Sequence, residues 1–473
     1  MMSHAPDEAM RPAVSTSKGY FVPLGCLPRL RLLRKALWFV ALMVAPPALH
    51  AWDRGDLAGY HERRAILVGR TGGDGVIVLY GYDDHDVAAS VTTFRQNEEF
   101  YYLTGWNEPG AMLMLVPKEA GANESSVLGR EILYLPPRDF IGEKWNGPRL
   151  GPDSPEAPAE TGFADVRSTK TLKSDLREAL KKFPKIYTEL TPQPESGEDC
   201  FQQDEVAKIR QLARAATLAD LRPLLISMRA VKSPGEIALI RKAVGNSVDA
   251  QIAAIKAVHP GVWEYEIASL MKYEFERHGS EWPSYPPIVG SGLYSTVLHY
   301  DADSRQMESG DLVVMDVAGS YSGYASDMTR TLPVNGHFTS RQREIYEIVR
   351  GAQAAVIAAA KPGVTFGGKD GLQRIAYDYI NTHGKDLHGK SLGRYFPHQV
   401  GHSVGLNVHD PMDETKPFEP GMIITDEPGI YIPEEKIGVR IEDMLLITPD
   451  GNEVLTKRLP GDPDEIERMM AGK

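Results

Sequence analysis

Four acidic residues interrupt apolar, strand-like segments in the C-terminal half of this chain. The segments are LVVMD, YASDMTR, MIITDE and VRIEDMLL, and their acids are Asp316, Asp327, Glu427 and Glu442. Burying an ionised carboxylate costs free energy unless an opposite charge compensates it. A single such acid is usually a strand-end cap or half of a surface ion pair, but four together need several positive charges. Two divalent cations would supply them, and a shared hydroxide would leave about one net negative charge.

The segment Pro397–Pro411, PHQVGHSVGLNVHDP, places histidines among glycines and apolar residues. A histidine is more often a packed core residue than a ligand. Here, however, Gly401 and Gly405 would let the backbone bend closely around whatever His402 faces. We therefore interpret His402 as the single nitrogen ligand beside the four carboxylates. Such an oxygen-rich set suits manganese or cobalt better than a structural zinc.

Arg440 and Glu442 lie two residues apart in the strand-like segment GVRIED. Residues two apart in a strand face the same side, so the two side chains should point together. That orientation would let the guanidinium hold a metal-bound carboxylate from behind. A plain buried ion pair would give the same sequence pattern, and both interpretations stay open here.

Helices and strands alternate through residues 226–473, which we expect to form one domain. Ser233 is typical of a helix N-cap, with Pro234 at the first helical position and Glu236 able to reach back to the cap amide. The helix should end near Val258, and three more helices are expected over Trp263–His278, Arg341–Lys361 and Gly368–His383. The strand-like runs are DLVVMDVAG, SDMTRTLPV, GMIITDEPG and VRIEDMLLIT. This pattern predicts an α+β domain with helices flanking a largely antiparallel sheet.

Residues 52–225 have the pattern of an α/β domain. The runs GVIVLYGY, AMLMLVP and REILYLPP are short, apolar and bounded by turn residues, as strands are. The stretch LKSDLREALKKF has helical spacing with a polar face. The polar segment Pro192–Gln203 predicts a surface loop close to the domain boundary. A helix over Leu212–Met228 should then lead into the second domain.

Residues 1–51 have the features of a leader. Four basic residues between Arg29 and Lys35 precede the ten apolar residues Ala36–Ala45. This run is shorter than the roughly 20 residues that a membrane-spanning helix needs. We interpret it as a signal peptide, with export to the periplasm or medium and no stable membrane insertion after its removal. The alternatives are an uncleaved membrane anchor and a disordered leader on a cytoplasmic protein.

Composition excludes several classes of protein. Of 473 residues, 42% are hydrophobic and 25% charged, a globular mix that excludes a disordered or collagen-like chain. Lys and Arg number 52 against 64 Asp and Glu, a net charge of −12, so we expect no nucleic-acid partner. The only cysteines are Cys26 and Cys200, too few for a disulfide scaffold or a thiolate zinc cluster.

The C-terminal half resembles the pita-bread metallopeptidases, in particular the Xaa-Pro aminopeptidases (aminopeptidase P), which are related to prolidase and methionine aminopeptidase. In that family an Asp, a second Asp eleven residues later, a His and two Glu bind two metals. The residues of this chain at those places are Asp316, Asp327, His402, Glu427 and Glu442. The string GHxxGLxxHD, from Gly401, implies that His409 contacts the substrate, and His299 of VLHYD matches the other substrate-contacting histidine. Tyr431 and Arg440 match positions on the proline side of the site, and His398 is a further substrate-binding candidate.

The N-terminal half carries two more strings of this family, FRQNEEFYYLTGWNEPGA and PRDFIGEKWNGPRLG. In the second, Trp145 takes the place of an aromatic residue that closes over the site, in some members from a neighbouring subunit. The resemblance therefore implies a homo-oligomer and covers nearly the whole chain after the leader. The chain departs from the family in its short connection of 15 residues from Glu427 to Glu442, which affects loop-dependent substrate selection.

The resemblance implies metal-dependent hydrolysis that releases the first residue from peptides with proline in second position. We expect two Mn²⁺ per subunit, with Co²⁺ or Zn²⁺ as alternatives, and a hydroxide between the ions as nucleophile. Glu427 would act as general base and then as general acid. His299 and His409 would steady the developing oxyanion or the substrate carbonyl. Arg440 is grouped with these catalytic candidates.

Several other functions share parts of this pattern. Prolidase has the same metal ligands but cleaves only dipeptides, so residue identities at the metals do not separate the two. A methionine aminopeptidase would not need the long N-terminal domain. A metal-free pita-bread binding module, or a creatine-hydrolysing relative, would be expected to have lost ligands that are all present here.

Overall fold

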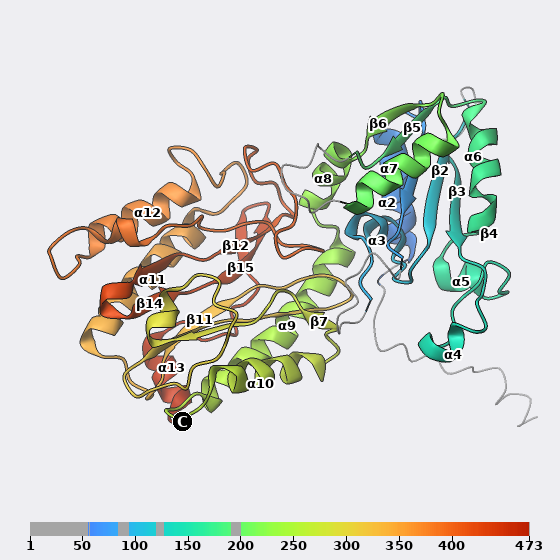
Figure 1. Ribbon diagram of the computed structural model, residues 1–473. Coiled ribbons are helices and arrows are strands. Elements are labelled where there is room, and N and C mark those ends of the chain that lie inside the picture. Colours follow the sequence, from blue (N-terminus) through green and yellow to red (C-terminus); the bar gives the residue numbers. More distant parts are fainter. Residues whose placement is uncertain (1–54, 56, 84–93, 120–126, 191–199, 473) are drawn as a thin grey trace, which may run out of the picture. The chain divides into compact units, whose positions relative to one another are not determined.

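The structure, a computed structural model, describes residues 55, 57–83, 94–119, 127–190 and 200–472 (Figure 1). The expected signal peptide lies outside these residues. Within the described ranges, no helix combines the length and the apolar character needed to cross a bilayer. Residues 52–473 form one compact unit.

A six-stranded mixed sheet organises the N-terminal part, in the order β4-β3-β2-β1-β5-β6. Its strands are β1 (Val76–Tyr80), β2 (Met112–Pro117), β3 (Leu128–Leu135), β4 (Asp165–Ser168), β5 (Lys185–Thr188) and β6 (Thr217–Asp220). The first three are antiparallel, whereas β4, β5 and β6 join the sheet through parallel pairings. The three apolar runs predicted as strands are therefore confirmed as β1, β2 and β3.

Helices cover both faces of this sheet because its central strands are apolar on both sides. Val76 and Val78 of β1 pack with α6 (Leu172–Leu180) and α7 (Cys200–Leu212). The alternate residues Ile77 and Leu79 belong to a second core with α2 (Leu57–Arg70) and α3 (Glu98–Thr104). This second core continues into the C-terminal part of the chain. The shorter helices here are α4 (Glu143–Asn146), α5 (Ala157–Thr161) and η1 (Thr169–Thr171).

The predicted helix over Leu212–Met228 is wrong. Helix α7 ends at Leu212, strand β6 follows, and a new helix, α8, spans Arg222–Ala230. The short β6 pairs in parallel with β5 and completes the sheet edge, a long-range contact that local periodicity does not reveal. The Asp220 carboxylate then accepts a hydrogen bond from the Arg222 amide at 3.2 Å, where α8 begins. Residues 200–203, predicted as the end of the surface loop, are helical and belong to α7. The domain boundary expected after residue 225 falls within α8.

The helices expected in the C-terminal part are present. They are α9 (Pro234–Ala257), α10 (Glu264–Glu276), α11 (Ser340–Ala359) and α12 (Leu372–His383), followed by α13 (Pro463–Met470). The capping box at Ser233 is confirmed, since its hydroxyl accepts from the Glu236 amide while the Glu236 side chain accepts from the Ser233 amide. The short 3₁₀ helices are η2 (Gly292–Thr296), η3 (Leu392–Tyr395) and η4 (Pro433–Glu435).

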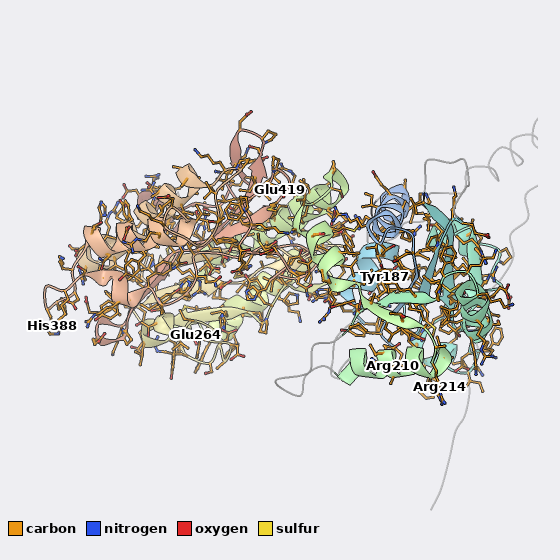
Figure 2. The ribbon with its side chains drawn as sticks, turned by 90° about the horizontal axis from the view of Figure 1, so that it is seen from above. Tyr187, Arg210, Arg214, Glu264, His388 and Glu419 are labelled. Carbon is orange, nitrogen blue, oxygen red and sulfur yellow. The ribbon has the colours of Figure 1, made fainter. Side chains whose placement is uncertain are left out.

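The C-terminal strands form small antiparallel sheets, as predicted. One sheet has the order β11-β9-β8, from β8 (Ile288–Ser291), β9 (Leu312–Asp316) and β11 (Thr329–Pro333), and another has the order β12-β15-β16, from β12 (Ile423–Asp426), β15 (Asp443–Thr448) and β16 (Gly451–Val454). Two pairs complete the set: β13 (Gly429–Ile432) with β14 (Ile437–Arg440), and β7 (Trp282–Pro283) with β10 (Gly319–Ser320). Figure 2 shows the side chains that fill the spaces between these elements.

Candidate active site

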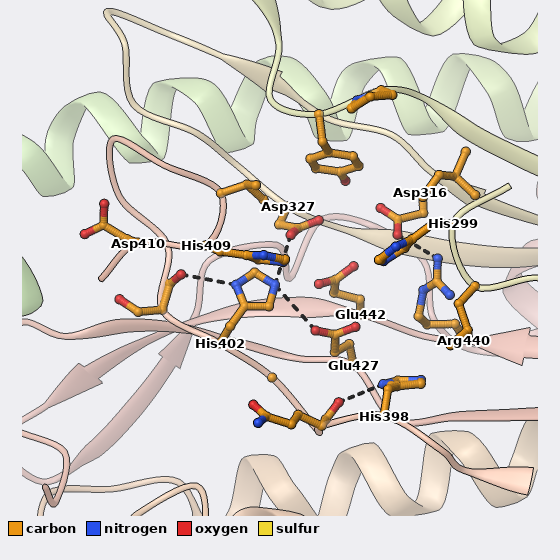
Figure 3. A pocket seen from close by; sticks show the side chains of 18 of the residues that line it. His299, Asp316, Asp327, His398, His402, His409, Asp410, Glu427, Arg440 and Glu442 are labelled. Atoms are coloured by element: carbon orange, nitrogen blue, oxygen red, sulfur yellow. Dashed lines mark hydrogen bonds and ion pairs between the residues drawn. The ribbon is translucent and has the colours of Figure 1, made fainter. Parts of the chain in front are cut away.

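One cavity of about 660 Å³ gathers most of the predicted site residues (Figure 3). Its lining includes all five predicted metal ligands, Asp316, Asp327, His402, Glu427 and Glu442, together with His299, His398, His409 and Arg440. Tyr431 stands behind this lining. Trp145 does not line the cavity of this chain and is 85% exposed on α4.

The four acids reach the cavity from strand ends and breaks rather than from within strands. Asp316 is the last residue of β9, Asp327 precedes β11, and Glu427 directly follows β12. Glu442 lies in the two-residue break between β14 and β15, so the run VRIEDMLLIT is two strands and not one. At this break the Glu442 amide donates to the Thr329 carbonyl at 3.1 Å, which ties it to β11.

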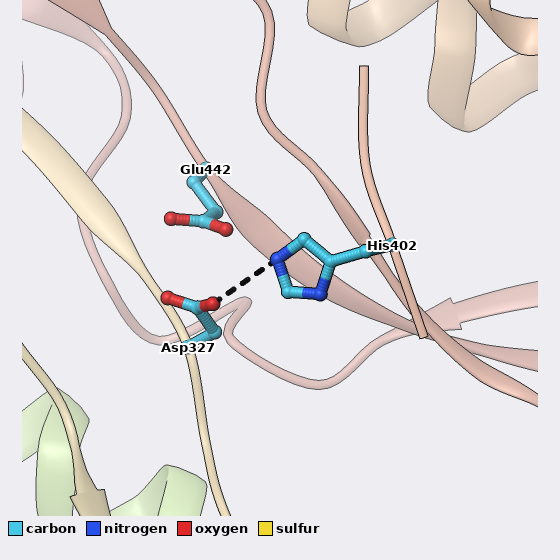
Figure 4. Close-up of side chains that lie close together, drawn as sticks. All are labelled: Asp327, His402 and Glu442. Atoms are coloured by element: carbon cyan, nitrogen blue, oxygen red, sulfur yellow. Dashed lines mark ion pairs between the residues drawn. The ribbon is translucent and has the colours of Figure 1, made fainter. Parts of the chain in front are cut away.

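Asp327, His402 and Glu442 form the tightest group of the cavity (Figure 4). One ligand atom from each lies within 4.8 Å of the others. His402 Nε2 lies 3.3 Å from Asp327 Oδ2 and 3.4 Å from Glu427 Oε1. The other ring nitrogen, Nδ1, lies 3.1 Å from the Ser403 carbonyl oxygen, so it carries the hydrogen and Nε2 faces the carboxylates.

Close backbone packing sets the position of His402. The Thr425 amide donates to the His402 carbonyl at 2.8 Å, and the His402 amide donates to Thr425 Oγ1 at 3.0 Å. A Cβ at Gly401 would overlap the backbone carbonyl of Thr425, so only glycine permits this approach. The Glu427 amide donates to the Val400 carbonyl at 2.9 Å, which brings Glu427 beside the same loop.

Arg440 holds Asp316 rather than Glu442. Its Nη2 donates to Asp316 Oδ2 at 2.6 Å, with both side chains buried. The Glu442 carboxylate instead accepts from the Thr329 hydroxyl at 2.7 Å, and the same hydroxyl accepts from Arg440 Nε at 3.2 Å. Arg440, the last residue of β14, thus contacts the carboxylate of Asp316 at the end of β9, whereas the strand pattern predicted it beside Glu442.

Tyr431 links Arg440 to His398. Its phenol oxygen lies 3.0 Å from Arg440 Nη1 and 2.9 Å from His398 Nε2. Burial lowers the pKa of His398 to about 4, and the nearby Arg440 charge acts in the same direction. His398 is therefore a neutral imidazole at neutral pH, and it orients the phenol without adding charge.

His299 and His409 stand at the exposed side of the cavity. The ring centroids of His409 and His402 are 4.2 Å apart in an edge-on arrangement. Burial and the positive charge of His402 lower the pKa of His409, which favours a neutral ring. His299 follows η2, in a segment that the buried Glu264 (Figure 2) anchors: its carboxylate accepts from the Ser291 amide at 2.7 Å and from the Tyr300 hydroxyl at 3.0 Å.

The carboxylates that line the cavity outnumber its positively charged side chains. Burial, together with the charges of Asp327, Glu427 and Asp316, raises the pKa of Glu442 well above its usual range. Burial also raises the pKa of Glu427 to about 7, although the nearby His402 opposes the shift. For His402, burial favours the neutral ring, but Asp327 and Glu427 outweigh it and raise the pKa to about 9.

This donor set fits divalent cations. Glu442 Oε1 is buried and has no hydrogen-bond partner among the residues that the structure describes. Carboxylate oxygens with one imidazole are ligands that manganese and similar ions prefer. Cations in the cavity would satisfy the unpaired oxygen and compensate the excess negative charge.

Sequence reasoning missed two polar residues that support the site. Thr329 carries the hydroxyl between Arg440 and Glu442, and Glu264 anchors the segment of His299. Thr329 could have been found, because it lies two residues after Asp327 and strand alternation puts both on one face. Glu264 gives no such signal, since an acid in the first turn of a helix is ordinary.

Two family models match the chain. Metallopeptidase family M24 matches residues 238–449, and the N-terminal domain of aminopeptidase P matches residues 60–187. As a metallopeptidase family, M24 implies divalent metal ions at the cavity described above. Fold and cavity together define a metallopeptidase of the pita-bread type.

Individual relatives extend the match over almost the full length. The Xaa-Pro aminopeptidase of Escherichia coli is 35% identical over 438 residues, which cover 86% of this chain and 96% of that one. The Xaa-Pro dipeptidase of Pyrococcus horikoshii is 39% identical over 287 residues, 59% of this chain and 78% of that one. The structure of proline aminopeptidase P II from Yersinia pestis superposes with a TM-score of 0.76 at 32% identity, covering 88% of this chain and all of that one. The chain belongs to the Xaa-Pro aminopeptidase (aminopeptidase P) family of metallopeptidases.

Proposed function

We propose that this chain removes the N-terminal residue from peptides that have proline in second position, by metal-dependent hydrolysis. The observation that carries the proposal is the convergence of four carboxylates and His402 in one buried cavity. The match to an Xaa-Pro aminopeptidase covers 86% of this chain, N-terminal domain included, and supports this activity over that of a dipeptidase, which matches 59% of the chain.

We assign the binding of two divalent ions, preferably Mn²⁺, to Asp316, Asp327, His402, Glu427 and Glu442. When bound, such a pair of ions lowers the pKa of a water molecule and so supplies a nucleophile near neutral pH. Arg440 would orient Asp316 through their 2.6 Å contact, and its charge opposes the burial that raises the pKa of Asp316. The Ser403 carbonyl would keep His402 in the tautomer that presents Nε2.

Proton transfer is the task of Glu427. Its Oε1 lies next to His402 Nε2 and Thr425 Oγ1, which leaves Oε2 for the reacting atoms. Oε2 would accept the proton of the attacking water and then deliver it to the departing proline nitrogen. This delivery is needed because, without a proton, the nitrogen would have to leave as a strongly basic anion.

Substrate orientation falls to the histidines of the cavity and the Tyr431–Arg440 pair. His299 and His409, on the exposed side, would hydrogen-bond the carbonyl on which negative charge develops. His398, Tyr431 and Arg440 form a continuous hydrogen-bonded wall, which we assign to the proline side. The rigid proline ring would fit such a fixed wall with little loss of conformational entropy.

The proposal is tested with an Xaa-Pro-Xaa tripeptide and an Xaa-Pro dipeptide, by chromatographic detection of the released first residue. The wild-type chain with Mn²⁺ should cleave the tripeptide, whereas Glu427→Gln should lose at least about 100-fold in kcat because it has no general base. The unfolding temperature of the variant shows that it is folded. Cleavage of the dipeptide alone would assign the chain to the dipeptidases instead.

Three further assignments go with this proposal. Residues 52–225 and 226–473 are the two proposed domains, and residues 1–51 are a signal peptide that directs export. Trp145, solvent-exposed in one chain, would reach the cavity of a neighbouring subunit in a homo-oligomer. We expect no nucleic-acid partner. N-terminal sequencing of the protein isolated from its cells checks the leader, since an intact Met1 contradicts cleavage.

A further inference from the structure

Two buried cations, Arg229 in the last turn of α8 and Lys232 between α8 and α9, contact the loop that carries His402 and His409. Arg229 is 2% exposed and Lys232 is 3% exposed, and neither lines the cavity. Arg229 Nη2 donates to Asp410 Oδ1 at 2.6 Å, and Lys232 Nζ donates to Asp410 Oδ2 at 3.2 Å. Each oxygen of the buried Asp410 carboxylate therefore has its own cation. One positive charge would be enough to neutralise this carboxylate, and two are present.

The loop over residues 402–410 is built around that carboxylate. The Asp410 amide donates to the Ser403 carbonyl at 2.9 Å and closes the loop, while Asp410 Oδ1 also accepts from the Asn407 amide at 3.2 Å. A Cβ at Gly405 would lie 2.5 Å from the Asp410 carboxylate, so glycine is needed for the side chain to fit. Lys232 Nζ adds a bond to Ser403 Oγ at 3.1 Å.

The two ends of this loop are the site histidines. Ser403 follows His402 and accepts its Nδ1 hydrogen through the carbonyl that Asp410 also bonds. His409 precedes Asp410 directly. Figure 3 shows the Asp410 carboxylate pointing away from both imidazoles, outside the ring of carboxylates around His402. A shift of Asp410 would therefore move both rings relative to the carboxylates.

Arg229 also connects the loop to the N-terminal part of the chain. Arg229 Nη1 donates to Glu99 Oε1 of α3 at 2.6 Å, and Arg229 Nη2 also donates to Asn407 Oδ1 at 2.6 Å. Arg95, just before α3, donates to the Leu406 carbonyl at 2.8 Å. The loop of the site histidines is thus bonded to both halves of the molecule.

We propose that Arg229 and Lys232 are positioning residues that act through Asp410 to fix the imidazoles of His402 and His409 in the cavity. The kinetic part of this inference rests on the proposed function, whereas its effects on metal affinity and on loop exchange do not. Residues that orient metal ligands from behind typically change metal affinity or activity by about 10- to 100-fold when they are altered.

The experiment compares three variants of the full chain. Asp410→Asn removes the charge that both cations hold, and Arg229→Lys keeps a positive charge but loses the planar fork that reaches Asp410, Asn407 and Glu99 together. The matched control is Glu131→Gln, which removes the charge from a part-buried ion pair of similar length, 2.7 Å to Arg64 Nε, inside the N-terminal domain. Each variant is measured for unfolding temperature, Mn²⁺ affinity by titration calorimetry, amide hydrogen exchange over residues 403–410, and kcat and KM on the tripeptide.

A positioning role predicts a pattern that lost stability alone does not give. Arg229→Lys and Asp410→Asn should weaken Mn²⁺ binding and lower kcat by about 10- to 100-fold, and speed amide exchange in the loop, at temperatures where the chain is folded. Glu131→Gln should lower the unfolding temperature, while Mn²⁺ affinity and kcat stay within about twofold of wild type. If Asp410→Asn does not fold, Arg229→Lys alone decides.

The inference is overturned if Arg229→Lys lowers the unfolding temperature as the control does but leaves Mn²⁺ affinity and loop exchange unchanged. Weaker Mn²⁺ binding and faster exchange in a chain with no activity on any Xaa-Pro peptide would support the positioning role and contradict the proposed function. The two proposals can therefore fail separately.

Discussion

At the scale of single residues, the sequence was most informative where the chemistry is local. A carboxylate at the end of an apolar strand is conspicuous by itself, so Asp316 and Glu427 could be proposed without any knowledge of the fold. Hydrogen-bond partners that come from another strand could not be proposed in this way. The Thr329 hydroxyl beside Glu442, and the contact of Arg440 with Asp316, depend on strand pairings that no local pattern specifies.

Metal affinity should rise steeply with pH because protons compete for the ligands. In the metal-free chain the pKa of Glu427 is raised to about 7 and that of His402 to about 9, so both hold protons that a cation must displace. Calorimetric titrations with Mn²⁺ at pH 6, 7 and 8 should show increasing affinity and net proton release at each pH. Equal affinity across this range would contradict the placement of these two groups among the ligands.

A second residue-scale prediction concerns Asp426, on the strand that leads to Glu427. Neither of its carboxylate oxygens has a hydrogen-bond partner among the described residues, and burial raises its pKa well above the usual range. A raised pKa in the folded state means that the stability it contributes is lost as the pH rises above about 4, the usual pKa of Asp. Asp426→Val should therefore increase the unfolding temperature, and more at pH 8 than at pH 5.

Its ladder neighbour Asp443 is the matched control for that substitution. Asp443 accepts hydrogen bonds from Arg330, Gln353 and Thr456, at 2.8, 3.0 and 2.6 Å. Asp443→Asn should lower the unfolding temperature, because it leaves the buried Arg330 without its counter-charge. A loss of stability in both variants would contradict the account of Asp426.

At the scale of elements, helices could be predicted well and short strands poorly. Ser233, Pro234 and Glu236 mark the start of α9 by hydrogen bonds within four residues, so the sequence contains the whole signal. Strand β6 exists because β5 offers it an edge, and the break between β14 and β15 exists because Glu442 bonds to β11. Both features are set by distant segments.

Gly401 provides an element-scale prediction. Gly401→Ala should push the loop of His402 away from β12, because the added methyl group would meet the Thr425 carbonyl. We expect Mn²⁺ affinity to fall by at least about 10-fold, together with the unfolding temperature. The control is Gly59→Ala in α2, where nothing lies within 4 Å of the added carbon and alanine should stabilise the helix by about 0.5–1 kcal/mol. Unchanged Mn²⁺ binding in Gly401→Ala would show that the loop tolerates displacement.

At the scale of the whole molecule, the division into an N-terminal α/β part and a C-terminal antiparallel part followed from patterning alone. The hydrogen bonds between those two parts could not be predicted from the patterning. Arg229 and Arg95 are ordinary residues in the sequence, yet Arg229 joins Glu99 of α3 to Asn407 of the loop over residues 402–410, and Arg95 contacts Leu406 of the same loop. The N-terminal part of the chain is therefore hydrogen-bonded to the loop that carries His402 and His409.

The most direct test of the account is metal content measured together with activity on one sample. The chain is dialysed against a chelator, reloaded with Mn²⁺, and analysed for bound metal while release of the first residue from an Xaa-Pro-Xaa peptide is followed. We predict no activity in the metal-free chain and full activity at two bound ions per chain. Undiminished peptide cleavage by a chain with no detectable metal would contradict the central claim.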